Sequence, residues 1–252
     1  MKSAPDGMSK SASSSLESLG LDGILVLNVR SFVERRKNIE SQLGPLGFRY
    51  EFIHEYDVPD LNTEAVQKYF QRSALSPGQQ SCAMKHLQAH RLIVEREWRQ
   101  ALILEDDVIL APGFAAGIRD ALTEAACLDE PHVLFIGSGG NLYTPRNLLV
   151  PGQRLYKANK GRLAEAYIIG RRAADLRIAW IEREGIILPA DNLFERIDHE
   201  LGIASYWLEE PVAVQGSKNG TFRSALEPAL PNCVQRIKFG LQKLRRKYFY
   251  SS

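Results

Sequence analysis

Three adjacent carboxylates, Glu105, Asp106 and Asp107, lie in the middle of the apolar stretch ALILEDDVIL at residues 101–110. Their mutual repulsion costs free energy, and so does burying a carboxylate that has no partner. Carboxylates are also the hard oxygen ligands that divalent cations prefer. A cation bridging two of them and a diphosphate would relieve the repulsion and neutralise charge on a phosphate leaving group. The alternative is a solvated turn whose acids cap the next helix.

Two histidines, His86 and His90, lie four residues apart on a predicted helix and therefore share one of its faces. This spacing suits zinc. However, no catalytic glutamate directly follows His86, and the sequence offers no obvious third ligand. The favoured interpretation is that both histidines pack or form hydrogen bonds near the site.

Other polar segments allow two interpretations each. The stretch GSGG at residues 137–140 follows a predicted strand but lacks the full dinucleotide-binding spacing, so a flexible loop is favoured. Asp191 in LPADNLF is either a helix N-cap or an active-site carboxylate, and the residues alone leave both open. Gln215 and Ser217 belong to a polar, glycine-containing loop that suits a hydroxyl-rich ligand or a surface turn.

The elements that position these residues alternate between strand and helix. Apolar runs predict strands at residues 23–29, 48–57, 101–104, 132–137 and 164–170, and helical periodicity predicts helices at 32–43, 77–98, 112–126 and 171–184. Ser76 and Gln79 have the spacing of a capping box, with Pro77 at the first helical position. This alternation predicts an α/β domain with a mostly parallel sheet. In such sheets, ligands bind outside the carboxyl ends of the strands, where the three acids fall.

Composition is that of an ordinary soluble protein, with 252 residues, 44% hydrophobic and 25% charged. Three scattered cysteines argue against a disulfide framework and for a reducing compartment. We find no apolar run of roughly 18 residues and no apolar stretch typical of a signal peptide, so we expect a cytoplasmic location. We expect a disordered Ser-rich leader at residues 1–20, one domain at 21–227 and a basic tail at 228–252.

The tail is basic and aromatic. No acidic residue follows Glu227, whereas six basic residues do: Arg236, Lys238, Lys243, Arg245, Arg246 and Lys247. Such a segment fits the surface of an anionic membrane. Nucleic acid and an ordinary solvated helix are the alternatives. We expect peripheral attachment to a membrane and no nucleic-acid partner.

With these residues in place, the chain from about Gly23 to Ser224 resembles glycosyltransferase family 25, the lipooligosaccharide galactosyltransferase type. The segments that carry the resemblance are LVLNVRSFVERR, LSPGQQSCAMKH, ALILEDDVIL, AEAYIIGRRAA with LPADNLF, and EPVAVQGS. Their order and spacing together are more specific than any one of them. Five positions depart from the family pattern: Val29, Gln79, Gln80, Ser81 and Lys85. We expect these departures to affect sugar specificity more than the type of reaction.

The resemblance implies a GT-A-like, Rossmann-type nucleotide-sugar-binding domain. It implies inverting transfer of a hexose, most often galactose, from a UDP-sugar to a lipopolysaccharide or lipooligosaccharide core, a lipid-linked acceptor at the inner face of the bacterial cytoplasmic membrane. By this analogy Glu105 and Asp107 would hold Mn²⁺ or Mg²⁺. Donor-binding residues would be Asn28, Arg30, His86, Glu105, Asp106, Gln215 and Ser217. The catalytic base would be Asp191, with Glu209 or Glu210 as second choices.

The departures also motivate a second hypothesis. A non-catalytic relative that binds a carbohydrate or nucleotide sugar at the membrane would tolerate changes at Val29, Gln79 and Lys85. Binding of UDP without turnover separates this hypothesis from an enzyme.

Overall fold

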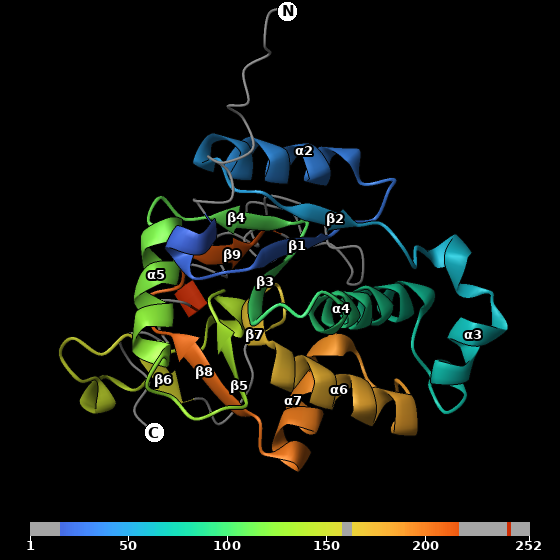
Figure 1. The fold of residues 1–252 in the computed structure, drawn as a ribbon. Helices are drawn as coiled ribbons and strands as arrows, with labels where there is room; N and C mark the ends of the chain where they lie inside the picture. The colour runs from blue at the N-terminus through green and yellow to red at the C-terminus, as the bar shows by residue number, and fades with distance from the viewer. Residues whose placement is uncertain (1–15, 158–162, 217–240, 243–252) are drawn as a thin grey trace, which may run out of the picture.

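A seven-stranded sheet forms the centre of the molecule in the computed structural model, which describes residues 16–157, 163–216 and 241–242 (Figure 1). The strand order is β2-β1-β3-β7-β5-β8-β6. The strands are β1 (Gly23–Leu27), β2 (Glu51–Ile53), β3 (Gln100–Glu105), β5 (His132–Phe135), β6 (Leu155–Lys157), β7 (Ala166–Gly170) and β8 (Ala204–Leu208). All run in one direction except β6 and β7. The predicted fold class, α/β with a mostly parallel central sheet, is confirmed.

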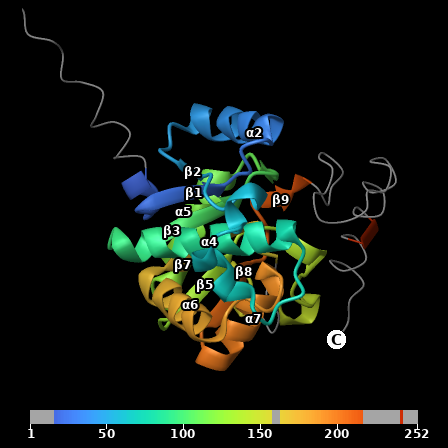
Figure 2. The same ribbon diagram turned by 90° about the vertical axis from the view of Figure 1, so that its right-hand side faces the viewer.

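Helices cover both faces of the sheet, as Figures 1 and 2 show. Helices α4 (Pro77–Glu95), α6 (Arg171–Glu184) and α7 (Ala190–Leu201) pack on one face, and α2 (Val33–Leu43) and α5 (Phe114–Ala125) on the other. Alternate residues of β1 supply both cores, with Leu25 facing α4 and Val26 facing α2 and α5. Both faces of the sheet are buried, which is why the strands read as continuous apolar runs.

Shorter elements complete the described chain. A second sheet pairs β4 (Val108–Leu110) with β9 (Ala213–Gln215), and α3 spans Glu64–Gln67. Turns of 3₁₀ helix occur at Gly44–Leu46, Val58–Leu61, Lys68–Phe70, Gly139–Asn141 and Arg146–Leu148.

The order of the first three strands creates a switch point between β1 and β3. The chain leaves β1, forms α2 on one face and enters β2 on one side of β1. It then forms α4 on the opposite face and enters β3 on the other side of β1. Because the connections diverge, a crevice opens at the carboxyl ends of these two strands, which is where α/β sheets bind ligands.

Helix α4 begins as predicted. The side chain of Ser76 accepts from the backbone N–H of Gln79, and the Gln79 side chain accepts from the backbone N–H of Ser76, which forms the capping box. The helix ends at Glu95, earlier than the predicted Trp98. Glu97 has a φ of 54°, a left-handed conformation that a helix cannot continue through.

The amino-terminal boundary differs from the prediction. Residues 16–19, assigned to the disordered leader, form a helical turn. Leu16 and Leu19 are buried with Leu21 against the core on the α2 and α5 side. The sequence LESLGL places these leucines on one side of a short turn, so the fold includes residues from at least Leu16 onward.

The predicted basic tail lies outside the described residues except for residues 241–242. In the part of the chain that is described, no helix is both long enough and apolar enough to cross a bilayer.

Candidate functional site

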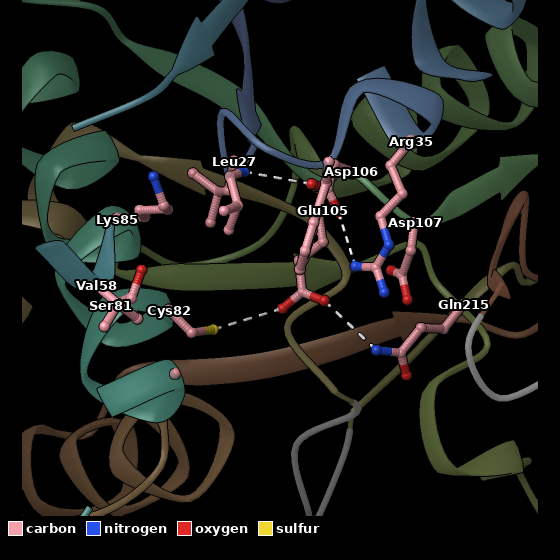
Figure 3. Close-up of a pocket in the computed structure, with 13 residues that line it drawn as sticks. Leu27, Arg35, Val58, Ser81, Cys82, Lys85, Glu105, Asp106, Asp107 and Gln215 are labelled. Carbon is pink, nitrogen blue, oxygen red and sulfur yellow. Dashed lines mark hydrogen bonds and ion pairs between the residues drawn. The ribbon is translucent and has the colours of Figure 1, made fainter. Parts of the chain in front are cut away.

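A pocket of about 280 Å³ lies at the carboxyl ends of β1 and β3 (Figure 3). Its apolar lining comes from Leu27, Val29, Phe32 and Val58. Its other lining residues are Arg35, Gly78, Ser81, Cys82, Lys85, Glu105, Asp106, Asp107 and Gln215. The crevice expected from the strand order therefore contains all three adjacent acids.

Asp106, the middle acid, is held by protein partners. Its Oδ1 lies 3.0 Å from Nη1 of Arg35, and its Oδ2 accepts from Nδ2 of Asn28 at 2.8 Å. Burial raises the pKa of the Asp106 carboxyl, an effect that the Arg35 guanidinium opposes. The same guanidinium lies over the Phe32 ring, 4.7 Å from its centroid. This acid thus ties the start of α2 to the end of β3 and shapes the pocket.

Glu105 points into the pocket from the end of β3. Its Oε2 accepts a hydrogen bond from Nε2 of Gln215 at 3.4 Å, and its Oε1 accepts one from the Cys82 thiol at 3.9 Å (Figure 3). Burial, with added repulsion from Asp107 and Asp106, raises the pKa of Glu105 to about 8. The Glu105 carboxyl therefore carries a proton at neutral pH until a positive group arrives.

Asp107 is positioned by the small β4–β9 sheet. The backbone carbonyl of Asp107 accepts from the N–H of Gly216 at 2.7 Å, and Val108 pairs with Gln215. This pairing brings Gln215, distant in sequence, beside Glu105 and Asp107. Two carboxylates that line one pocket form a hard oxygen donor set that fits Mn²⁺ or Mg²⁺.

The two histidines lie behind the pocket rather than in its lining. Nδ1 of His86 and Nε2 of His90 each lie 3.0 Å from the Tyr167 hydroxyl, and both side chains are fully buried. Burial lowers the pKa of His86 to about 4, so this imidazole is neutral at physiological pH. The interpretation that these histidines pack and form hydrogen bonds near the site agrees with this arrangement.

Lys85, one of the departures from the family pattern, is among the residues that line the pocket. Its ammonium lies 2.8 Å from Oδ1 of Asp57 and donates to the carbonyl of Glu55 at 2.7 Å. Desolvation lowers the pKa of Lys85, while Asp57 opposes this effect. The Lys85 ammonium thus binds groups of the protein itself and holds the segment after β2 against α4.

Arg30, predicted to contact the donor, is turned toward other acids. Its Nη1 lies 2.8 Å from Oδ2 of Asp60 and 3.4 Å from Oδ2 of Asp57, and Arg30 is not among the residues that line the pocket. Arg35 lines the pocket in its place.

The three candidate bases lie away from the pocket lining. Asp191 falls in the first turn of α7, whose N-cap is Pro189, so the N-cap interpretation of Asp191 is wrong. Its Oδ1 instead accepts from the N–H of Ala164 at 2.6 Å, which ties α7 to the segment before β7.

The two adjacent glutamates after β8 differ in environment. Glu209 is buried and its Oε2 accepts from the backbone N–H of Thr144 at 3.1 Å and from Nε1 of Trp207 at 3.2 Å. Glu210 is exposed. Ser217, predicted to bind the donor, lies outside the described residues.

A fourth carboxylate, Glu165, was missed in the sequence. It is fully buried directly before β7, its backbone carbonyl accepts from the N–H of Glu105 at 2.9 Å, and burial raises its pKa well above the usual value. Its Oε1 accepts from the N–H of Gly139 at 2.7 Å. The available signal was an acid inside the apolar run AEAYIIG.

This contact also gives the loop at GSGG, which was predicted to be flexible, a buried neighbour. Residues 137–139 are buried, and a Cβ at Gly137 would lie 2.4 Å from Oε1 of Glu165. The glycines are needed because a buried carboxylate occupies the space that their side chains would fill.

The fold and the pocket together define an open α/β domain that binds its ligand in the crevice at the carboxyl ends of its parallel strands. Residues 22–144 match the model of glycosyltransferase family 25 (LPS biosynthesis protein), so the family resemblance is confirmed over this segment.

Two curated relatives carry the description glycosyltransferase 25 family member. The one from Drosophila pseudoobscura pseudoobscura is 27% identical over 130 residues, and the one from Drosophila melanogaster is 24% identical over 130 residues. Each alignment covers 47% of this chain and 21% of the relative, so the chain matches about a fifth of the length of these proteins.

Two solved structures are similar to this chain at low sequence identity. Mouse xyloside xylosyltransferase 1 gives a TM-score of 0.42 at 14% identity, covering 73% of this chain and 72% of that one. A glycosyltransferase involved in glycosylation of the PBCV-1 major capsid gives 0.42 at 12% identity, covering 87% and 99%.

Proposed function

We propose that this chain is a metal-assisted, inverting glycosyltransferase. It would transfer a hexose, with galactose as first choice, from a UDP-sugar to a lipopolysaccharide or lipooligosaccharide core acceptor. One observation carries the proposal: Glu105 and Asp107 line the same pocket at the β1–β3 switch point, within the segment that matches family 25. The description of that family as an LPS biosynthesis protein supports the choice of acceptor.

The donor would bind across this pocket. Glu105 and Asp107 would hold the divalent cation, which supplies positive charge next to the diphosphate of the leaving nucleotide. Leu27, Val29 and Phe32 offer apolar surface for the nucleoside. Arg35 keeps Asp106 in place and adds a cation at the pocket wall.

The base would remove the proton from the acceptor hydroxyl. Asp191 remains the first choice, because it is the carboxylate of the PAD segment that resembles the family pattern. Glu209 is buried and its Oε2 accepts two hydrogen bonds from protein groups, which makes it a second choice. Glu210 is exposed and is the remaining alternative.

Attachment to the inner face of the cytoplasmic membrane is part of the same proposal. It rests on the basic and aromatic composition of residues 236–250. This location would bring the pocket to a lipid-linked acceptor.

The test is a release assay for UDP with UDP-galactose, UDP-glucose and their N-acetyl forms. We expect turnover with at least one donor, loss of turnover with EDTA and recovery with Mn²⁺ or Mg²⁺. Asp107→Asn should abolish release, whereas Asp120→Asn, which removes an exposed acid on α5 paired with Arg154, should leave it unchanged. Binding of UDP without release across all donors and acceptors would instead favour the non-catalytic relative.

A further inference from the structure

A cysteine and a glutamate in the pocket lining converge with a histidine that lies directly behind it. One ligand atom from each of Cys82, His86 and Glu105 lies within 4.8 Å of the other two. Cys82 and His86 are four residues apart on α4 and so share a face, while Glu105 comes from the end of β3. The Sγ–Oε1 distance is 3.9 Å and the Nε2–Oε1 distance is 3.6 Å. Ligand atoms around a tetrahedral Zn²⁺ lie roughly 3.3–3.6 Å apart, so small side-chain movements would close the site.

An independent observation concerns Nε2 of His86. In the described structure this nitrogen is buried and has no hydrogen-bond partner, although it lies 3.6 Å from Glu105. A buried polar atom without a partner costs free energy, and most buried polar atoms in proteins have one. A metal ion at this position would satisfy it.

The neighbours of His86 suit a ligand role. If Nδ1 of His86 donates to the Tyr167 hydroxyl, that hydroxyl can donate to Nε2 of His90, and both distances are 3.0 Å. This arrangement leaves a lone pair on Nε2 of His86, aimed at Glu105. A partner that fixes the tautomer through the other ring nitrogen is typical of histidines that bind metals.

We infer that Cys82, His86 and Glu105 form a binding site for an ion of the zinc class. A thiolate with an imidazole selects Zn²⁺ or Co²⁺ over the Mg²⁺ or Mn²⁺ that carboxylates alone prefer. Because Cys82 and Glu105 also line the pocket, the three protein ligands leave one coordination position open to it. Glu105 is shared with the proposed Mn²⁺ or Mg²⁺ site, whereas Cys82 and His86 take no part in that site and Asp107 takes no part in this one. The inference therefore goes beyond the proposed reaction, and binding of the ion can be measured without turnover.

The experiment titrates Co²⁺ into the full-length, metal-stripped, reduced protein. We expect one Co²⁺ per chain with a thiolate-to-cobalt charge-transfer band in the near ultraviolet, and loss of that band when Zn²⁺ is added. Zn²⁺ should also raise the melting temperature. Absence of the band in the folded wild-type protein would overturn the inference.

Variants assign the ligands. Cys82→Ser should remove the band and the Zn²⁺-dependent rise in melting temperature, and Glu105→Gln should weaken binding roughly tenfold or more. Cys127→Ser, which changes an exposed cysteine, is the matched control and should behave as wild type. A band that persists in Cys82→Ser would place the metal elsewhere. Asp107→Asn should keep the charge-transfer band but lose UDP release. The band therefore tests this site, and UDP release tests the proposed function.

Discussion

Nη1 of Arg35 lies 3.0 Å from Oδ1 of Asp106, and the two side chains are 15% and 7% exposed. The ion pair divides the three adjacent acids into two groups. Asp106 is neutralised by the protein and supports the pocket wall, whereas Glu105 and Asp107 face the cavity on either side of it. The repulsion among these acids is therefore reduced by one partly buried cation at the middle position.

Removing that cation should destabilise the fold in a pH-dependent way. Arg35→Met leaves Asp106 without its cation and should lower the free energy of unfolding by about 3 kcal/mol at pH 7. Burial already raises the pKa of Asp106, and loss of Arg35 raises it further. The cost should therefore be small at low pH, where Asp106 is protonated in both states, and grow as the pH rises.

Urea unfolding between pH 4 and 8 measures this effect. Arg36→Met is the control, because Arg36 forms its ion pair with the partly exposed Glu40 on the same helix. The double variant Arg35→Met with Asp106→Asn should recover much of the loss. Equal losses for Arg35→Met at both ends of the pH range would contradict the role given to the ion pair.

The raised pKa of Glu105 predicts a second pH effect. This carboxyl has a pKa of about 8 in the folded protein and an ordinary value near 4.5 when unfolded. Between these values the unfolded chain releases a proton that the folded protein keeps, so stability falls as the pH rises from about 4.5 to 8. Glu105→Gln should be more stable than wild type at pH 8 and similar to it at pH 4.5, in metal-free buffer.

The difference in free energy of unfolding between wild type and Glu105→Gln reports on Glu105, because the titration of His86 contributes to both proteins. Chemical unfolding at each pH gives the comparison, with Glu40→Gln as the control for an exposed acid. A wild-type protein that matches Glu105→Gln at pH 8 would show that Glu105 ionises normally.

The metal site predicts a role for Tyr167. Tyr167→Phe removes the hydroxyl that bonds Nδ1 of His86 and should weaken Co²⁺ binding by about 10–100-fold. It should also lower stability by about 1–3 kcal/mol, since two buried imidazoles lose a partner. Tyr156→Phe, whose hydroxyl bonds the backbone of Val150, is the control and should bind Co²⁺ as wild type does. Unchanged Co²⁺ affinity in folded Tyr167→Phe would mean that this hydroxyl does not orient a ligand.

Lys85 should matter for stability and not for the choice of donor. Lys85→Met leaves Asp57 without its nearest cation and should cost about 3–5 kcal/mol. Lys68→Met, which removes an exposed cation paired with Glu182, should cost less than about 1 kcal/mol. Protein that remains folded should rank UDP-sugars as wild type does. A changed ranking would return Lys85 to the specificity role that the sequence suggested.

Local signals predicted most of the fold. The capping box at Ser76 located the start of α4, and apolar runs located β1, β3, β5 and β7. These features depend on residues close together in sequence, so periodicity and side-chain chemistry are enough. The same reasoning placed the three acids at the end of a strand, where they line the pocket.

Features that depend on distant contacts were less predictable. The grouping of Cys82, His86 and Glu105 requires α4 to lie against the end of β3, which no local pattern gives. Arg30 and Arg35 look alike in sequence, and only their partners Asp57 and Asp106 separate their roles. Leu16 and Leu19 were assigned to a disordered leader, because the segment around them is Ser-rich. Their burial depends on contacts with residues of α2 and α5 that are distant in sequence.

The reversed direction of β7 determines which chain segments can meet beside the pocket. Since β7 runs against β3, the residue that precedes β7, Glu165, meets the residue that ends β3, Glu105. If β7 ran parallel to β3, Glu165 would lie at the opposite ends of the strands from Glu105. Gly137 and Gly139 would then have no carboxylate packed against them. A single inverted strand thus places an acid that precedes a strand beside an acid that ends one, although the two are 60 residues apart in the sequence.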